Sequence, residues 1–265
     1  MAEGIGQVIV TGGASGIGAG VCELLAARGQ KVIVADRNRE ISAELIESLA
    51  SKGINVSARR LDVSDPEAIT QFYSSLLADG ILATGLVNCA GINVRAGALD
   101  FKPSDWQKVM DVNLRGTALM AQGFAKALIR EGRTGAIVNV ASMLAHYGAP
   151  NLISYSASKG GVAMVTRSLA VEWASSGIRV NAVSPGYIQT SLTAKIFSIE
   201  SYRHTIVRRT PLGRLGNPED LARVVAFLIS EDSRFVTGQI IPVDGGITAG
   251  DTALGPPPDQ LLASA

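Results

Sequence analysis

QVIVTGGASGIG, residues 7–18, decides the fold, because it joins a short β-branched run to a glycine-rich turn and the start of a helical pattern. A turn this tight needs residues without a Cβ where φ is positive or where the backbone approaches a ligand. A helix that begins here directs free N–H groups and partial positive charge at an anion such as a pyrophosphate. Gly12, Gly16 and Gly18 give the order Gly-x-x-x-Gly-x-Gly. We predict a phosphate-binding loop, with a plain strand–helix turn as the alternative.

Short β-branched runs alternate with longer helical patterns along the whole chain. Strands are expected at 7–11, 31–36, 55–60, 85–88, 136–141, 178–183 and 239–243. Helices are expected at 17–28, 39–52, 103–131 and 153–176, and two more begin near 65 and 218. Apolar strands that alternate with helices predict an α/β fold: one Rossmann-type domain, with a doubly wound parallel sheet of about seven strands and helices on both faces.

This catalytic domain is expected to cover residues 1–250, because no linker divides it. Segment 190–212 is less regular and is predicted to be a substrate lid. Residues 251–265 contain the run Gly-Pro-Pro-Pro and no packing pattern, so we expect a C-terminal tail that is mobile or faces a partner.

The composition excludes several classes of function. The 265 residues are 47% hydrophobic and 18% charged, with a net charge of +1 and no basic cluster, so nucleic acid is not expected as a partner. Two cysteines and two histidines make neither a disulfide framework nor a zinc cluster, and we expect no metal. The N-terminus does not resemble a secretion signal, and no apolar run reaches the length of a membrane span. We therefore expect a soluble, cytoplasmic protein with no membrane partner.

Tyr155 and Lys159 are the most informative candidate catalytic residues. They are four residues apart in a predicted helix, so the phenol and the ammonium share one face. A nearby cation lowers the pKa of a phenol and lets it exchange a proton near neutral pH. Ser142 lies thirteen residues before Tyr155, where it could stabilise charge on a substrate oxygen. The alternatives are a packed aromatic residue, a solvated lysine and a turn serine.

Asp36 ends the second predicted strand, and Arg37 follows it. A carboxylate at the tip of that strand can accept both hydroxyls of an adenosine ribose and repel a 2′-phosphate, which favours NAD over NADP. Arg37 works in the other direction, because a guanidinium beside the ribose would tolerate that phosphate. An exposed loop carboxylate is the alternative interpretation of Asp36.

Taken together, these features resemble the short-chain dehydrogenase/reductase family over about residues 5–247. The residues that carry the resemblance are Thr11 to Gly18, Asp62-Val63, Asn88-Cys89-Ala90-Gly91, Asn113, Ser142, Tyr155, Lys159 and Pro185-Gly186. Two departures are visible: the family often has a second asparagine where Cys89 stands, and the tail after Asp244-Gly245-Gly246 is longer than usual.

The resemblance implies a role for each matching residue. It implies Tyr155 as the general acid/base, Lys159 as its partner and a ribose ligand, Ser142 as a ligand of the substrate oxygen, and Asn113 as support for a water that links Lys159 to solvent. It implies NAD contacts from Gly12, Ser15, Gly16, Ile17, Gly18, Asp36, Arg37, Asp62, Val63, Asn88, Ala90, Gly91, Pro185, Gly186, Ile188 and Thr190.

The expected reaction is NAD-dependent interconversion of a secondary alcohol and a ketone. Similarity to family members that act on sugars, polyols and aldonates favours such a small-molecule substrate. A 3-oxoacyl thioester reductase or general ketone reductase is the alternative, and a non-catalytic nucleotide-binding member is a third. Candidate substrate contacts, besides Ser142 and Tyr155, are His146 and Tyr187, with further candidates at Asn93, Arg95, Met143 to Gly148, Tyr202, His204, Arg208 and Arg209.

The helices expected at 103–131 and 153–176 carry small and apolar residues on several faces. In the resembling family the equivalent helices pack against a second copy. We therefore expect a homotetramer, or else a homodimer.

Overall fold

The computed structural model describes residues 6–54 and 56–250. Seven parallel strands form one sheet in the order β3-β2-β1-β4-β5-β6-β7. The strands are β1 Gln7–Thr11, β2 Val32–Asp36, β3 Ser57–Arg60, β4 Ala83–Asn88, β5 Gly135–Val140, β6 Ile178–Pro185 and β7 Ile240–Val243. The chain runs outward from β1 to β3 and then returns to β4 on the other side of β1. The connections on either side of that point diverge and leave a crevice at the carboxyl ends of the strands.

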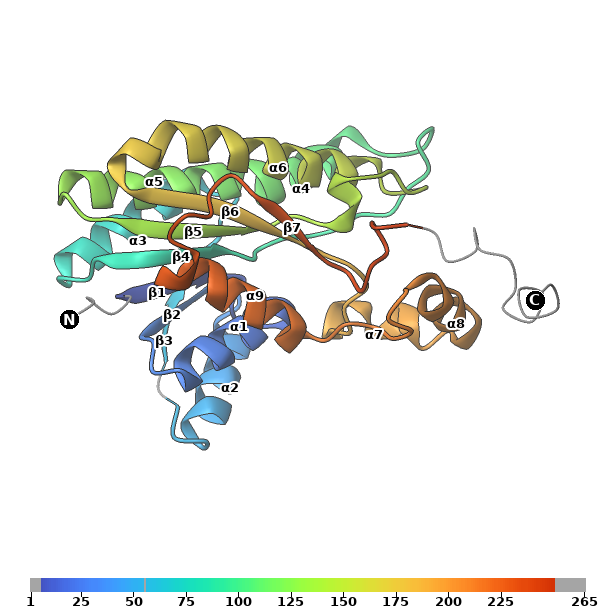
Figure 1. The fold of residues 1–265 in the computed structure, drawn as a ribbon, viewed down its shortest axis with the longest axis horizontal. Coiled ribbons are helices and arrows are strands. Elements are labelled where there is room, and N and C mark those ends of the chain that lie inside the picture. The colour runs from blue at the N-terminus through green and yellow to red at the C-terminus, as the bar shows by residue number, and fades with distance from the viewer. Residues whose placement is uncertain (1–5, 55, 251–265) are drawn as a thin grey trace, which may run out of the picture.

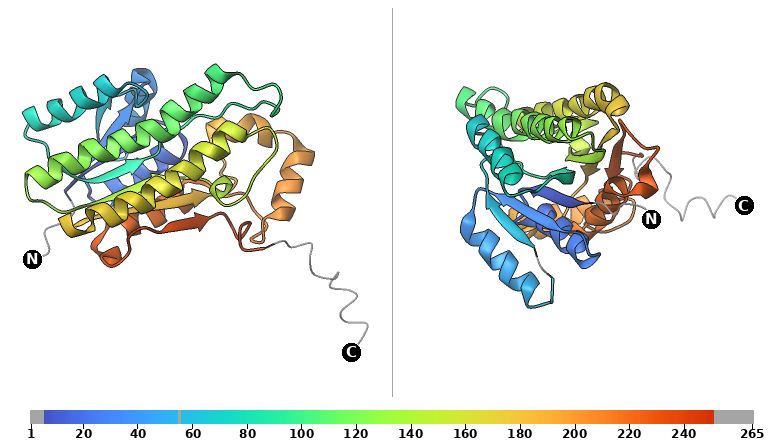
Figure 2. Two further views of the ribbon diagram at one scale, coloured as in Figure 1. Left: turned by 90° about the horizontal axis from the view of Figure 1, so that it is seen from above. Right: turned by 90° about the vertical axis from the view of Figure 1, so that its left-hand side faces the viewer.

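Helices cover both faces of this sheet (Figure 1). They are α1 Gly16–Ala27, α2 Arg39–Ala50, α3 Pro66–Ala78, α4 Pro103–Met110, α5 Gly116–Arg130, α6 Ile153–Trp173, α7 Ser191–Phe197, α8 Glu200–Arg209 and α9 Pro218–Ile229. One layer contains α3, α4, α5 and α6, and the other contains α1, α2 and α9; the two views in Figure 2 show the sheet between them. The single α/β domain with a doubly wound parallel sheet is confirmed.

Alternate residues of one strand enter the two halves of the core. In β1, Val8 and Val10 pack toward α1 and α9, whereas Ile9 packs toward the layer that contains Phe124 of α5. These four residues are at most 1% exposed to solvent. This alternation explains the continuous apolar runs, because a strand covered on both faces has no polar side.

Two expectations about the helices were wrong. The helix expected at 103–131 is interrupted by a π-helical turn, Asp111–Arg115, which separates α4 from α5. Asn113 lies in that turn, where the Thr117 hydroxyl donates to its carbonyl and its side chain binds the backbone of Ile92. These bonds compete with the regular helical pattern, which is why an asparagine here marks a local change in winding.

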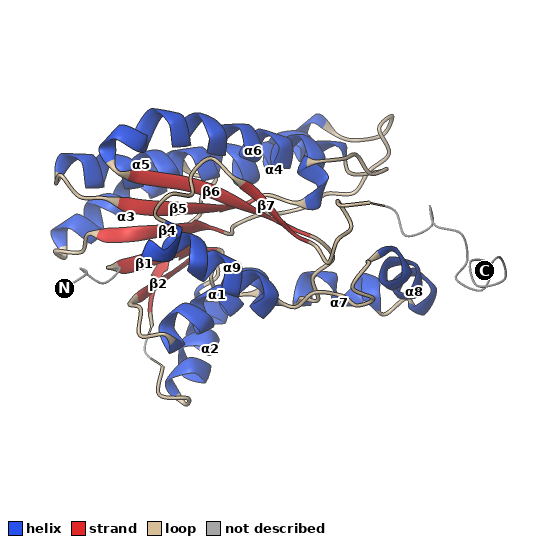
Figure 3. Ribbon diagram, viewed as in Figure 1, coloured by secondary structure: helices blue, strands red, loops and turns tan. Residues whose placement is uncertain are grey.

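Segment 190–212 is also more regular than expected, because it contains α7 and α8. Thr190 and Thr193 form a reciprocal capping box that starts α7. Both helices stand beyond the carboxyl ends of the strands, apart from the two layers (Figure 3). The expected strand at 55–60 begins at Ser57, and Asn55 and the tail 251–265 lie outside the described residues. The remaining boundaries move by three residues or fewer.

Within the described residues, no helix has the length and apolar character needed to cross a bilayer. That part of the chain also lacks any group of three or more His, Cys, Asp or Glu side chains placed to hold a metal ion.

Candidate active site

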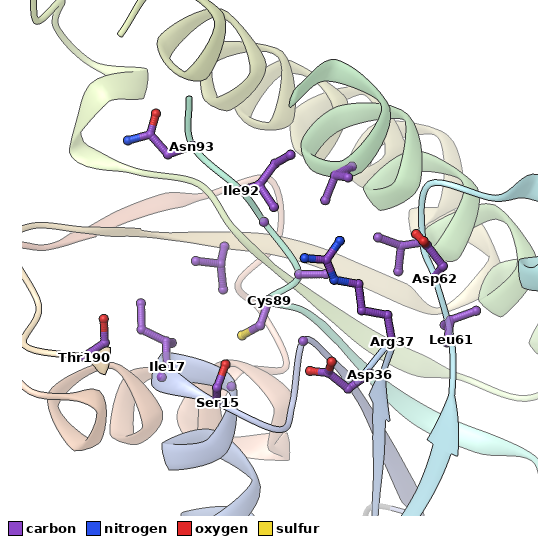
Figure 4. Close-up of a pocket in the computed structure, with 18 of the residues that line it drawn as sticks. Ser15, Ile17, Asp36, Arg37, Leu61, Asp62, Cys89, Ile92, Asn93 and Thr190 are labelled. Atoms are coloured by element: carbon purple, nitrogen blue, oxygen red, sulfur yellow. The ribbon is translucent and has the colours of Figure 1, made fainter. Parts of the chain in front are cut away.

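A groove of about 320 Å³ lies at the carboxyl ends of β1, β2 and β4 (Figure 4). The structure brings most of the predicted cofactor residues to its wall. They are Gly12, Ser15, Gly16, Ile17, Gly18, Asp36, Arg37, Asp62, Val63, Ala90, Gly91, Tyr155, Lys159 and Thr190. The sequence argument missed Leu61, Cys89, Ile92, Val112, Val140 and Ser191. Most of these residues are next to a predicted residue in the sequence, so extending each predicted segment by one residue would have found them.

The phosphate loop is shaped by close backbone packing. Gly12 has φ +61°, and a Cβ at this position would lie 2.8 Å from the Cα of Ala90. The side chain of Ser15, which precedes α1, does not cap that helix. The first N–H groups of α1 are therefore not capped by this side chain, which leaves the predicted pyrophosphate site a prediction.

Asp36 holds this loop against β2. Its Oδ2 accepts a hydrogen bond from Ala14 N at 3.2 Å, and its Oδ1 accepts one from Asn38 N at 3.0 Å. Each carboxylate oxygen has a second lone pair, so both can still accept from a ligand hydroxyl. Figure 4 places Asp36, Arg37 and Asp62 at one end of the groove, with Ile17 and Thr190 at the other. A hydrogen bond from the Ser64 hydroxyl, 2.6 Å away, holds the pKa of Asp62 below its usual range.

Ser142 and Tyr155 meet at the edge of the groove. Ser142 follows β5, is 6% exposed, and accepts a hydrogen bond from Leu144 N at 3.1 Å. Its side chain also hydrogen-bonds the Tyr155 hydroxyl. Burial nevertheless raises the pKa of Tyr155 above its usual value, and the bond from Ser142 only partly offsets this. The lowering of this pKa that the spacing to Lys159 led us to expect is not seen: the ammonium lies 5.7 Å from the ring centroid, and desolvation raises the pKa instead.

Lys159 is a buried cation beside that phenol. Its Nζ donates to the carbonyl of Val140 at 2.7 Å, at the end of β5. Burial lowers the pKa of Lys159 from 10.5 to about 8. A Cβ on Gly91 would lie 3.5 Å from this Nζ, so the glycine leaves the ammonium reachable from the groove. The chain thus supplies a cation whose charge changes close to neutral pH.

Asn113 is fully buried and its amide is fully used. Its Oδ1 accepts from Ile92 N at 2.8 Å, and its Nδ2 donates to Ile92 O at 2.9 Å and to Ser158 Oγ at 3.0 Å. These bonds fasten the loop after β4 to α6, the helix that carries Tyr155 and Lys159. Asn113 therefore positions both walls of the groove.

Asn88 lies beneath the groove instead of on its wall. Its Nδ2 donates to Asn139 Oδ1 at 2.9 Å, and Asn139 Nδ2 donates to Thr166 Oγ1 of α6 at 2.9 Å. This buried ladder joins β4, β5 and α6. Asn88 Oδ1 has no hydrogen-bond partner among the described residues, but the bonds of the ladder fix relative positions, so Asn88 acts on the site through the placement of α6.

The segment after β6 reaches the groove through Thr190 and Ser191. Pro185 is buried at the end of β6, and a Cβ on Gly186 would lie 2.7 Å from the Cα of Asp244. Ile188 is buried and pairs with Gly216. Pro185, Gly186 and Ile188 thus shape the course of this segment and do not line the groove in the structure.

The two further substrate candidates occupy different surroundings. His146 is exposed, with its Nε2 3.0 Å from the hydroxyl of buried Ser184. Tyr187 packs on the same apolar cluster as Tyr155, so it lies close to the predicted catalytic pair. Tyr187 stays a predicted substrate contact, whereas His146 turns toward β6.

Comparison with known proteins agrees with this geometry. A family model described as enoyl-(acyl carrier protein) reductase matches residues 12–248. The chain belongs to the short-chain dehydrogenase/reductase family. Its fold and the intact Ser142, Tyr155 and Lys159 are those of a family member, and it is an oxidoreductase that acts on CH–OH groups.

Several family members are similar over nearly their whole length. The 3-oxoacyl-acyl-carrier-protein reductase FabG of Thermotoga maritima is 39% identical over 90% of this chain and 96% of its own. A galactitol 2-dehydrogenase of Cereibacter sphaeroides is 40% identical over 90% of this chain and 93% of its own.

Solved structures add information about the cofactor. A gluconate 5-dehydrogenase from Burkholderia cenocepacia, in complex with NADP and tartrate, has a TM-score of 0.88 and 33% identity over 92% of this chain and 96% of that one. A 4-hydroxyisoleucine dehydrogenase complexed with NADH has a TM-score of 0.87 and 30% identity over 93% of this chain and 100% of that one. A nicotinamide cofactor is thus supported for this family member.

The lowered pKa of Lys159 predicts how stability depends on pH. Between about pH 8 and 10.5 the unfolded chain keeps a proton on Lys159 that the folded chain releases, so this residue makes stability rise with pH. Relative to Lys159→Met, the free energy of unfolding should gain about 3 kcal/mol across that window. Urea unfolding of both proteins at several pH values measures this difference. Parallel curves would show that Lys159 does not titrate there.

Proposed function

We propose that this protein is an NAD-dependent dehydrogenase that interconverts a secondary alcohol and a ketone on a polyol, sugar or aldonate. The observation that carries the proposal is the position of Tyr155. Its side chain forms part of the groove wall, packs on the apolar cluster next to Tyr187, and bonds to Ser142. This arrangement supports a role for Tyr155 as the proton donor between the groove and a substrate bound beside Tyr187.

The residues of the groove fit a nicotinamide dinucleotide. The free N–H groups at the start of α1 would hold the pyrophosphate, Asp36 the adenosine ribose, and Lys159 the nicotinamide ribose. When bound, the nicotinamide supplies the hydride acceptor for alcohol oxidation and the donor for ketone reduction.

The chain's own residues handle the proton. During oxidation the substrate O–H gives its proton to the Tyr155 oxygen, and Ser142 hydrogen-bonds the same substrate oxygen as charge develops on it. The Lys159 ammonium, 5.7 Å from the ring centroid, would favour the phenolate form of Tyr155 and so act against the rise that burial causes in its pKa. Burial also keeps water away from the reacting oxygen.

The preference for NAD rests on Asp36. A 2′-phosphate on the adenosine ribose would meet this carboxylate, whose other contacts hold it in place. The ratio of kcat/KM for NAD⁺ to that for NADP⁺ should exceed about 10, since one charge repulsion is worth more than about 1.4 kcal/mol in such a site. Asp36→Asn should lower the ratio without loss of the NAD⁺ reaction. If the wild-type protein preferred NADP⁺, Arg37 and not Asp36 would determine the binding of the adenosine ribose, by accepting its 2′-phosphate.

Similarity to FabG favours one alternative function, reduction of a 3-oxoacyl thioester. A panel of polyols, aldonates, ketones and 3-oxoacyl thioesters, followed by absorbance of the reduced nicotinamide, tests both. Oxidation of polyols or aldonates with NAD⁺ supports the proposal. Turnover confined to thioesters with NADPH would replace it, and nucleotide binding without any turnover would indicate a non-catalytic member.

Two structural proposals accompany this function. We propose that α7 and α8 form the substrate lid of the 1–250 domain, because they stand beyond the strands next to Thr190. We also propose a homotetramer, or else a homodimer, in which α5 and α6 contact another copy. Met164 is 57% exposed and Val171 83% exposed on α6. Light scattering at micromolar concentration should give a multiple of the 27.5 kDa chain.

A further inference from the structure

The substrate side of Tyr155 is bordered by aromatic rings from three separate segments. Tyr147 follows β5, Tyr187 follows β6, and both pack with Tyr155 on one apolar cluster of Met143, Leu144, Leu152 and Ile247. Tyr202 of α8 joins them through a hydrogen bond with Tyr187.

Arg209, in the last turn of α8, adds a cation to this border. Its guanidinium carbon lies 5.2 Å from the centroid of the Tyr147 ring. Arg209 forms no ion pair with any of the residues that the structure describes, and its side chain is exposed. The ring thus holds the guanidinium in place by cation–π attraction, while its N–H donors stay available.

The neighbouring carboxylate does not neutralise Arg209. Asp244 acts electrostatically on Tyr147, but its own oxygens are engaged within one turn. Its Oδ1 accepts from Gly246 N at 2.9 Å, and its Oδ2 accepts from Thr248 N at 2.8 Å and Thr248 Oγ1 at 2.7 Å. These local bonds fix Asp244 and leave the charge of Arg209 without a bonded partner among the described residues.

The positive charge of Arg209 acts on the phenols of Tyr147 and Tyr187. It opposes the rise that burial causes in the pKa of Tyr147, and it does the same for Tyr187. The hydroxyl of Tyr147 is buried and has no hydrogen-bond partner among the described residues. A buried hydroxyl without a partner is costly alone, and here it belongs to the ring beside a guanidinium that makes no ion pair within the described residues; the pair becomes favourable when an anion accepts from both.

We propose that Arg209 and Tyr147 bind a carboxylate of the substrate, so that the enzyme prefers a hydroxy acid such as an aldonate over the corresponding neutral polyol. The inference rests on the proposed function. The planar guanidinium matches a carboxylate in two parallel hydrogen bonds, whereas a hydroxymethyl group offers one neutral acceptor. The substrate would then be held at two points, with its reacting oxygen at Ser142 and Tyr155 and its carboxylate at the lid. Because Arg209 lies on α8, a bond between it and the carboxylate would also favour closure of α8 over the site.

Gluconate and sorbitol test this proposal, because C1 is a carboxylate in gluconate and a hydroxymethyl group in sorbitol. Arg209→Gln should lower kcat/KM for gluconate by about 10- to 100-fold, mainly through KM, as expected for the loss of hydrogen bonds to a charged group. The value for sorbitol should change less than about twofold. Arg209→Lys should recover part of the loss, because it restores charge without the planar fork.

Arg203→Gln is the matched control, since Arg203 is exposed on the same helix and the substitution removes the same charge. It should leave both substrates unchanged within about twofold, which excludes a general effect of net charge. Equal losses for gluconate and sorbitol in Arg209→Gln, or turnover of neutral polyols with no turnover of any hydroxy acid, would overturn the inference and leave the proposed dehydrogenase activity standing. The absence of turnover of every alcohol would instead overturn the proposed function.

Discussion

Replacing Tyr155 with phenylalanine should lower kcat by about a thousandfold, which is the usual size of a general acid/base contribution. The phenyl ring keeps the packing on the cluster that contains Met143 and Leu144, so the shape of the site should survive. Only the hydroxyl that bonds to Ser142 is removed. Steady-state rates with a saturating alcohol and NAD⁺ measure the effect.

The dinucleotide should bind Tyr155→Phe as it binds the unchanged protein, because the phosphate loop and Asp36 are untouched. Nucleotide titration followed by fluorescence separates this from a folding defect. A variant that kept the original rate would remove Tyr155 from the chemistry and, with it, the proposed reaction. A variant that lost nucleotide binding as well would instead assign Tyr155 a structural role in the groove.

Replacing Gly18 with alanine should weaken dinucleotide binding by about 100-fold, equivalent to roughly 2.7 kcal/mol. The added Cβ would overlap the carbonyl oxygen of Gly12 and would lie 3.0 Å from the Cα of Gly13. Both contacts are to backbone, so no side chain can move aside and the phosphate loop must shift. Overpacking of this kind should also lower the free energy of unfolding by about 1–3 kcal/mol. Calorimetric titration with NAD⁺ and urea unfolding measure the two effects.

Gly160→Ala is the matched control for Gly18→Ala. Gly160 lies in α6, and a Cβ there would have no heavy atom within 4 Å. The same substitution should therefore raise the unfolding free energy by about 0.5–1 kcal/mol, because alanine is the better helix former. Nucleotide binding should be unchanged. Equal affinity for NAD⁺ in Gly18→Ala and Gly160→Ala would exclude the tight loop as the pyrophosphate site.

Most of the groove could be predicted from the chain because its residues follow directly on strand ends. Asp36 at the end of β2 and Gly91 after β4 lie on one wall for that reason, since parallel strands present their carboxyl ends at the same edge. Val112 could not be found in this way. It reaches the wall from a π-helical turn whose existence depends on bonds between Asn113 and Ile92, which are far apart in the chain.

The roles of polar residues were harder to predict than their positions. Asn88 was expected beside the cofactor, but its amide belongs to the ladder through Asn139 and Thr166. The protonation of Tyr155 was expected from its spacing to Lys159, but burial has the larger effect on its pKa. Spacing along a helix shows which groups share a face, whereas desolvation depends on everything packed around them.

The sequence by itself determined the α/β fold, the phosphate loop and the pair formed by Tyr155 and Lys159, because each arises from local spacing or from strand–helix alternation. Only the tertiary structure decided the pKa values of that pair, the π-helical turn at Asn113, and the position of Arg209 over Tyr147. The physical reason is that burial and long-range contacts bring together groups from separate elements, and no local pattern records which groups will meet.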